Sequence, residues 1–218
     1  MFQFSLFRKI LFKRHISLHK KRLRLIENCA SKYGINFYSP KDFNSINPNQ
    51  FSSCHIWGSG VSANLTRKII KNKNNIFNIG FNLSAILDLK FNFYFIENAQ
   101  SNNLQLIDIQ KMLINDILRP ANCTVVMKNI WQKKNDFELA IRSFGDQVNF
   151  VRDLTFPHHG NSDFAIDICA KKLLEKDNYY FRQSCTTVIT AIVFAYNLGF
   201  KKIVLHGVDL GGGYFYDD

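Results

Sequence analysis

The sequence lacks the features that identify several classes of protein. Its five cysteines form no CxxC pair and are odd in number, which argues against a disulfide framework and against a zinc site. The apolar stretches near the N-terminus are only a few residues long, so neither a transmembrane helix nor the apolar region of a signal peptide fits them. No internal repeat or low-complexity tract is evident. These absences predict a protein of the reducing cytoplasm.

Acidic residues are missing before Glu27, and eight of the eleven excess positive charges lie in the first 24 residues. Apolar residues are interleaved with these lysines and arginines, namely Phe2, Phe4, Leu6, Phe7, Ile10, Leu11 and Ile16. The pattern is typical of an amphipathic helix on an anionic membrane surface, and equally of a basic helix packed on the domain. An arm that binds nucleic acid is less favoured, because no RNA- or DNA-binding signature follows it. We therefore expect residues 1–24 to contact the inner leaflet of the membrane.

Length and composition predict one folded domain behind this segment. With 218 residues, 46% of them hydrophobic, the chain is long enough to form a single core. Residues 32–53 are polar and contain Pro40 and Pro48, which is typical of a connector. We therefore divide the chain into a basic N-terminal extension with its connector, residues 1–50, and one α/β domain, residues 51–218.

A strand, a glycine turn and a helix follow the connector. Cys54–Trp57 is a short apolar run that leads into Gly58, Ser59 and Gly60, and residues 63–73 have the pattern of a helix. Glycines let the backbone approach a ligand closely, and the N-terminus of a helix favours phosphate. The third glycine of a GxGxxG fingerprint is missing, so a purely structural turn is an equal alternative.

Two further strands each end in an asparagine. Residues 76–82 and 91–98 are apolar runs that end at Asn82 and Asn98. Amide side chains both donate and accept, so these two could read a base, a ribose or a sugar without adding charge. The alternative is ordinary turn chemistry at a strand end, which asparagine also favours. Further strands and helices alternate along the chain, over 101–118 (helix), 123–127 (strand), 137–144 (helix), 148–151 (strand) and 164–174 (helix). This alternation predicts an α/β fold with a mostly parallel sheet.

His158 and His159 lie in a polar loop before the last of these helices. Adjacent side chains in extended chain point in opposite directions, so the pair is poorly placed to bind one metal ion. We interpret both as loop residues.

The last forty residues concentrate polar side chains around two buried elements. Residues 188–198 form an almost wholly apolar helix, and residues 203–205 form a short buried strand. The helix is preceded by a polar entrance that carries Arg182, Ser184, Thr186 and Thr187. A helix N-terminus with hydroxyls and a cation favours a negatively charged ligand.

Beyond the last strand the sequence places an acid and two phenols. Asp209 either lies at the ligand-binding edge of the sheet or caps a turn, and the spacing does not separate the two. Three glycines, 211–213, then lead to Tyr214 and Tyr216, whose hydroxyls can donate to a phosphate. Asp217 and Asp218 match a metal-binding D-x-D motif poorly, because they are adjacent.

Taken together, these motifs resemble the bacterial lipooligosaccharide sialyltransferases of glycosyltransferase family 42. The resemblance covers roughly residues 53–218 and rests on the order of the GSGVS turn, the two strand ends with asparagine, the stretch Arg182–Thr186, the sequence LHGVD over 205–209 and the stretch Tyr214–Asp217. It implies a Rossmann-like, GT-A-like domain that binds CMP-sialic acid and transfers the sugar, with inversion and without a metal ion, to a hydroxyl of a lipooligosaccharide or capsular glycan. It implies no cofactor.

The resemblance also assigns roles to individual residues. Ser59, between Gly58 and Gly60, stands where the family has an asparagine, and Asn82 and Asn98 match its nucleotide- and sugar-contacting asparagines. Arg182 matches an arginine of the active site. Three more residues of the donor site are Ser184, Cys185 and Thr186, with serine and cysteine standing where the family has threonine and serine. Tyr214, with Tyr216 or a later tyrosine, matches the pair that holds the departing phosphate.

The catalytic base of the family is a histidine downstream of the tyrosine loop, in a segment that this sequence does not contain. We therefore expect the sequence to be a C-terminally truncated member. Transfer of another CMP-activated acid sugar, Kdo, pseudaminic acid or legionaminic acid, is the near alternative. A non-catalytic protein that binds nucleic acid through the basic arm is the other. The acceptor, the linkage and the oligomeric state, a homo-oligomer included, are left open by the sequence.

Overall fold

The computed structural model describes residues 2–70, 73, 75–97, 104–128, 134–155, 171–173, 175, 179–183 and 186–209. Its centre is a sheet of seven strands in the order β1-β6-β5-β4-β3-β2-β9, and every pairing in it is parallel. The strands are β1 (Phe37–Tyr38), β2 (Ser53–Trp57), β3 (Ile76–Phe81), β4 (Phe93–Glu97), β5 (Thr124–Lys128), β6 (Asn149–Val151) and β9 (Ile203–His206). The prediction of an α/β fold with a parallel sheet is confirmed.

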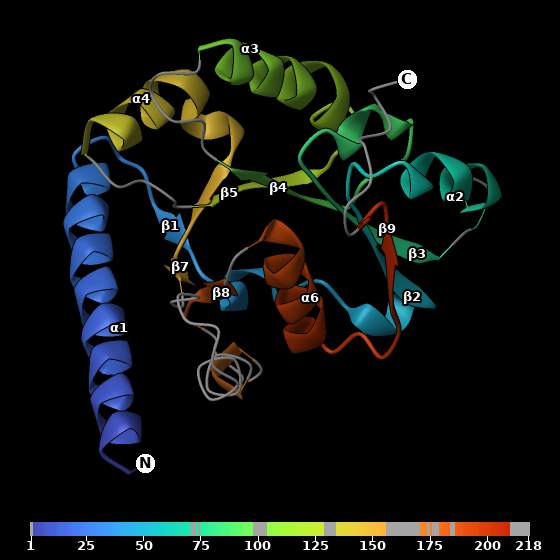
Figure 1. The fold of residues 1–218 in the computed structure, drawn as a ribbon. Helices are drawn as coiled ribbons and strands as arrows, with labels where there is room; N and C mark the ends of the chain where they lie inside the picture. Colours follow the sequence, from blue (N-terminus) through green and yellow to red (C-terminus); the bar gives the residue numbers. More distant parts are fainter. Residues whose placement is uncertain are drawn as a thin grey trace.

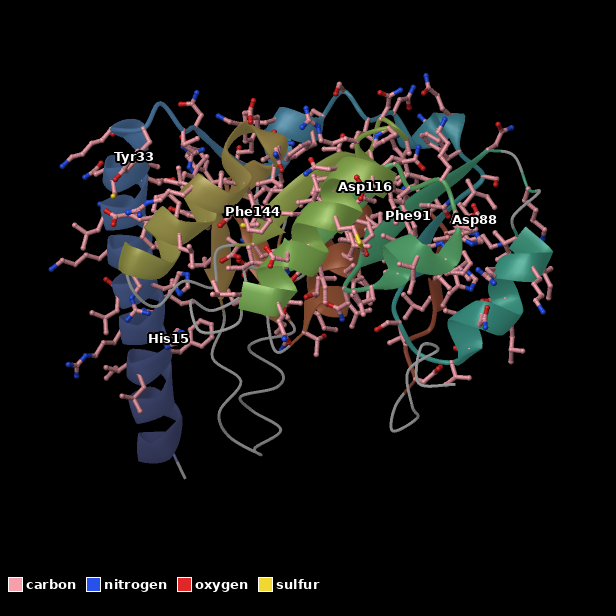
Figure 2. All side chains as sticks on the ribbon, turned by 90° about the horizontal axis from the view of Figure 1, so that it is seen from above. His15, Tyr33, Asp88, Phe91, Asp116 and Phe144 are labelled. Carbon is pink, nitrogen blue, oxygen red and sulfur yellow. The ribbon has the colours of Figure 1, made fainter. Side chains whose placement is uncertain are left out.

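Helices cover both faces of this sheet (Figure 1). One face carries α3 (Leu104–Met112), which continues as the π-helical η4 (Leu113–Leu118), and α4 (Lys134–Phe144). In Figure 2, which views the molecule from this side, Asp116 of η4 and Phe144 of α4 lie over the sheet. The opposite face carries α6 (Thr187–Leu198), and α2 (Ser62–Ile70) lies near the β2–β9 end. Short 3-10 turns complete the connections, namely η1 (Pro40–Phe43), η2 (Pro48–Gln50), η3 (Ser84–Leu87) and η5 (Gly145–Gln147).

The core consists of one apolar layer on each face of the sheet. All five residues of β2 are buried, as expected for an inner strand of a parallel sheet with both faces covered. Beneath α6, an aromatic cluster joins Phe43, Phe93, Phe95, Phe181 and Phe194, with ring centroids 4.5–6.1 Å apart. Each fully buried phenylalanine stabilises the fold by about 1.5–3 kcal/mol relative to an exposed one. This packing fixes the N-terminus of α6 over the carboxyl ends of the strands.

The region between 32 and 53 differs from the predicted connector. Phe37–Tyr38 forms the outermost strand β1, which pairs with β6, and Phe43 is buried in the aromatic cluster. A two-residue strand is too short to give an alternating pattern in the sequence, which is why the polar composition concealed it. The sheet therefore begins before residue 50.

The C-terminal forty residues also differ from the prediction in two places. Phe181–Gln183, expected as the entrance of a helix, forms strand β8, which pairs in parallel with β7 (Asp153–Thr155) in a separate two-stranded sheet. The buried strand expected at 203–205 is β9, which lies at one end of the seven-stranded order, and Leu205 is 44% exposed. Helices 101–118, 137–144 and 188–198 are confirmed within a few residues, whereas most of 164–174 lies outside the described residues.

The basic N-terminal segment forms α1 (Phe2–Ser31), a helix of thirty residues along one side of the molecule (Figure 1). Its C-terminal half is anchored, because Leu23, Ile26 and Ala30 are buried and Arg152 Nε lies 2.5 Å from Glu27 Oε1. The prediction of a helix here is confirmed. Within the described residues, no helix combines the length and the apolarity that crossing a bilayer requires.

Candidate functional site

The carboxyl ends of β2 and β9 form the point at which the strand order reverses. Successive strands β2 to β6 extend the sheet in one direction, and β9 returns to pair with the other side of β2. In open α/β sheets, ligands bind outside the carboxyl ends of the strands at such a point. The predicted glycine turn lies there.

Backbone hydrogen bonds hold the glycine turn against the end of β9. The N–H of Gly58 donates to the carbonyl of His206 over 2.8 Å, and the N–H of Gly60 donates to the carbonyl of Gly207 over 2.9 Å. A Cβ atom on Gly58 would lie 2.4 Å from the Gly207 carbonyl oxygen. Glycine at 58 is therefore required by the approach of the two backbones, and Ser59 between the two glycines is 4% exposed.

Asp209 lies on the N-terminus of α2. Its Oδ2 accepts from the backbone N–H of Ser62 over 2.9 Å, and its Oδ1 accepts from the Ser62 hydroxyl over 2.5 Å. These hydrogen bonds, the hydroxyl first, hold the pKa of Asp209 below its usual range. Of the two alternatives that the sequence left open, the structure shows the cap. The carboxylate takes the place at the helix end that an anionic ligand would favour, so such a ligand would compete with it.

Asn82 directly follows β3 and lies in the left-handed region, with φ of 57°, and the residue is exposed. Its backbone carbonyl accepts a hydrogen bond from the buried Tyr94 hydroxyl over 2.7 Å. Burial raises the pKa of that phenol, which keeps it protonated as a donor. The backbone of Asn82 thus has the conformation of a turn. Its side-chain amide lies at the carboxyl edge of the sheet, and its contact with a ligand stays a prediction.

A charged cluster that the sequence did not reveal lies two strands further along the same edge. Lys128, at the end of β5, is 2% exposed, and its Nζ lies 2.8 Å from Glu97 Oε1 at the end of β4. The same ammonium donates to the hydroxyl of Thr187, the first residue of α6, over 3.0 Å, and that hydroxyl also contacts Glu97 Oε1. In the sequence, the one indication of this cluster is that a lysine, Lys128, ends an apolar run that forms a buried strand.

This cluster keeps Glu97 ionised. Burial raises the pKa of the Glu97 carboxyl, but the charge of Lys128 and the hydrogen bonds from Lys128 and Thr187 outweigh burial, and the pKa lies below its usual range. Both contacts are made to Oε1, and the side chain is 42% exposed. Among the described residues, Oε2 has no hydrogen-bond partner, so this oxygen of the ionised carboxylate can accept from a hydroxyl of a ligand.

Arg182 lies on β8 and is 8% exposed. Its Nη1 contacts the backbone carbonyl of Lys172 and lies 3.8 Å from Glu175 Oε2. Thr186 is the N-cap residue of α6 and has extended backbone. The structure thus places Arg182 in the small sheet, five residues before the Lys128–Glu97–Thr187 cluster begins on α6.

Several predicted residues lie outside the described part of the chain. They are Asn98, Ser184, Cys185, Tyr214 and Tyr216, together with His158 and His159. Their assigned roles stay predictions. Within the described residues, groups of three histidine, cysteine, aspartate or glutamate side chains suited to a metal ion are absent.

Two buried histidines, His55 of β2 and His206 of β9, lie next to each other at the β2–β9 end of the sheet. One ring nitrogen of His206 shares a hydrogen bond of 2.8 Å with His55, and His55 contacts the Ser53 hydroxyl over 2.9 Å. His206 also stacks on Trp57, with ring centroids 4.0 Å apart. Burial, and then the neighbouring His55, lower the pKa of His206 to about 4, while burial followed by the charges of Lys202 and Lys73 lowers the pKa of His55. His206 is thus a packed residue at the end of β9.

Acidification is expected to destabilise the fold between pH 6.5 and about 4. A histidine has a pKa near 6.5 in an unfolded chain, so in this window the unfolded state binds more protons than the native state, and stability falls as the pH falls. His19 adds to the effect, since burial, then His15 and Arg22, lower its pKa to about 4. Urea unfolding at pH 7 and pH 5 measures how much the free energy of unfolding falls between the two pH values. This decrease should be about 1–2 kcal/mol smaller in His206→Asn than in the wild type. An equal loss in both proteins would contradict the assignment to His206.

Sequence and structure comparisons complete the description. No family model and no curated protein matches the sequence. Among solved structures, the sialyltransferase CstII from Campylobacter jejuni in complex with CMP is 16% identical, with a TM-score of 0.41 over 76% of this chain and 66% of that one. The monofunctional alpha-2,3-sialyltransferase Cst-I of the same organism is 15% identical, with a TM-score of 0.41 over 75% and 57%. A CST-II complex with a trisaccharide acceptor and CMP gives 15% identity and a TM-score of 0.43 over 74% and 65%. The chain spans less than two thirds of the length of these structures.

Proposed function

We propose that this chain belongs to an inverting, metal-independent glycosyltransferase that moves sialic acid from CMP-sialic acid to a hydroxyl of a lipooligosaccharide or capsular glycan. The observation that carries the proposal is the carboxyl edge of the sheet, where a glycine turn at the β2–β9 reversal and the Lys128–Glu97–Thr187 cluster flank Asn82. These are the positions that a nucleotide and its attached sugar occupy in open α/β folds. The family-like order of motifs in the sequence supports CMP-sialic acid as the proposed donor.

The proposed reaction divides the work among the residues of this edge. Cleavage of the donor leaves negative charge on the phosphate of CMP and an oxocarbenium-like sugar, so the site must hold the phosphate and deprotonate the attacking hydroxyl. The phenols of Tyr214 and Tyr216 and the guanidinium of Arg182 are the proposed phosphate ligands. Asn98, Ser184, Cys185 and Thr186 are proposed to contact the donor. The base is proposed to be a histidine outside this sequence.

The proposal also covers the acceptor and the location of the protein in the cell. The acceptor is proposed to be a glycan or lipid-linked glycan at the inner leaflet, with the protein in the cytoplasm and peripheral to the inner membrane. The support is the basic α1, which carries eight lysines and arginines before the first acid. Another CMP-activated acid sugar fits the same site chemistry equally, because its donor presents the same nucleotide, phosphate and carboxylate.

Thermal unfolding with nucleotides tests the cytidine part of the proposal. At concentrations about 100-fold above the dissociation constant, CMP should raise the melting temperature by about 5–10 °C, and AMP by clearly less. In Asn82→Gly, the melting temperature without ligand should stay close to that of the wild type, because glycine adopts the left-handed backbone freely. The shift by CMP should fall by at least about half, since the amide is gone.

Two outcomes would contradict different parts of the proposal. If CMP and CDP stabilise the protein no more than AMP does, the cytidine assignment fails. If CMP stabilises the wild type and Asn82→Gly equally, the nucleotide site stands but the role of Asn82 does not.

A further inference from the structure

A basic pocket lies between the middle of α1, residues 12–24, and the small β7–β8 sheet. In Figure 1 this is the side of the molecule opposite β9 and α2. Its volume is about 770 Å³. This is within the usual range for a small-molecule site, about 300–1,000 Å³. Apolar side chains of Phe12, Ile16 and Leu154 form part of the lining. The pocket is separate from the glycine turn and is not explained by donor binding there.

Positive charge dominates the rest of the lining. Four cations come from α1, namely Lys13, Lys20, Lys21 and Arg24, and two come from the β8 side, namely Lys172 and Arg182. Glu175 is the one acid among the lining residues, and it contacts Lys172 and lies 3.8 Å from Arg182. The lining of the pocket thus carries six cations and one acid.

The cations of α1 are arranged on one helical face. Lys13, Ser17, Lys20 and Arg24 follow the spacing i, i+4, i+7 and i+11, which places them in one row facing β7 and β8. Arg14 and Arg22 lie on the same helix, are exposed and do not line the pocket. The anchoring of the C-terminal half of α1 by Leu23, Ile26 and the Glu27–Arg152 pair holds the row in place.

Burial of Arg182 makes the pocket more than a basic surface. Arg182 as a whole is 8% exposed. Its surroundings have a lower dielectric constant than water, so an anion placed there interacts more strongly than on an open surface. Arginine and lysine together are the usual ligands of phosphate oxygens. The adjoining apolar lining suits a hydrocarbon attached to such a group.

We propose that the α1–β8 pocket binds a ligand with a multiply charged phosphate group, such as a diphosphate, whose phosphates contact Lys13, Lys20 and Arg24. The ligand is either a soluble diphosphate or the head group of a lipid whose chain follows Phe12 and Ile16. Binding is saturable, with one ligand per chain, in contrast to a diffuse attraction of α1 to a charged membrane. The pocket shares Arg182 with the proposed donor site, so the contacts to the new ligand are assigned to the α1 cations Lys13, Lys20 and Arg24, which the donor proposal does not use.

The test uses the full chain and two matched double variants. Lys20→Gln with Arg24→Gln removes two pocket cations, and Arg14→Gln with Arg22→Gln removes the same charge from the same helix outside the pocket. Calorimetric titration with inorganic pyrophosphate should give one site in the wild type and in the control. The dissociation constant should rise at least about tenfold in the pocket variant, which is a loss of about 1.4 kcal/mol.

Co-sedimentation with phosphatidylcholine vesicles, with and without phosphatidic acid, separates the two sources. A lipid head group is the ligand if the protein binds vesicles with phosphatidic acid and pyrophosphate displaces it from them. In that case the pocket variant should lose vesicle binding and the control variant should keep it. Pyrophosphate binding without vesicle binding assigns a soluble diphosphate. Equal losses in the two double variants, or no saturable binding of pyrophosphate by the wild type, would overturn the proposal.

Discussion

Replacing Glu97 with glutamine is expected to lower the free energy of unfolding by about 2–3 kcal/mol, whereas replacing its partner Lys128 with methionine should cost about 1 kcal/mol or less. The difference follows from burial. Lys128 is 2% exposed and Glu97 is 42% exposed. Loss of the carboxylate leaves a buried ammonium with the Thr187 hydroxyl as its described partner, but loss of the ammonium leaves a carboxylate that water can reach.

Urea unfolding of both single variants and the double variant measures this asymmetry. The double variant should resemble Lys128→Met, because glutamine no longer faces a buried charge, and the magnitude of the coupling energy should therefore be about 2–3 kcal/mol, the full cost of Glu97→Gln. Asp116→Asn is the control, since Asp116 is an exposed acid on η4. If Lys128→Met lowers the free energy of unfolding more than Glu97→Gln does, the ammonium of Lys128 is not a buried charge that needs the carboxylate of Glu97.

Replacing Gly58 with alanine is expected to cost about 3 kcal/mol and to abolish CMP binding. The new methyl group would lie 2.4 Å from the Gly207 carbonyl oxygen, which is backbone and cannot rotate away as a side chain would. Relief of the contact requires β2 and β9 to separate at their carboxyl ends, and this lengthens the hydrogen bond from Gly58 to His206.

Gly34→Ala is the matched control for this prediction. Gly34 has φ of 69° and open space around the position of a Cβ atom, so alanine there isolates the backbone cost of the left-handed conformation, about 1 kcal/mol. Urea unfolding of the two variants and calorimetric titration with CMP provide the measurements. If Gly58→Ala is no less stable than Gly34→Ala, the two backbones do not approach as closely as described.

The sequence was sufficient to predict the central part of the sheet but not its margins. Strands β2 to β5 are apolar runs bounded by turn residues, and such runs follow directly from burial on both faces. Strands β1 and β8 have two and three residues, and their pairing depends on partners more than 100 and about 30 positions away, respectively. A short segment of that kind is defined by the tertiary structure and not by its own composition.

In the candidate site too, residues with a local sequence signal could be predicted, whereas residues placed by long-range contacts could not. Gly58 and Gly60 could be identified because glycine next to a strand has a local meaning. Asp209 could not be assigned, because its partner Ser62 is 147 positions away. Lys128 was missed altogether, since only the register of β4 with β5 places it opposite Glu97. The placement of Arg182 beside α1 likewise depends on the packing of a helix that starts 180 residues earlier.

The position of β9 has a consequence for how ligand binding and folding are linked. In the described sheet, the strand that completes the glycine turn is also the outermost strand, with Leu205 exposed. Edge strands open at a lower free energy than central ones, so local opening of this edge would also disrupt the proposed nucleotide site. Under the proposed function, the fraction of molecules with an open edge should fall by mass action as the nucleotide concentration rises.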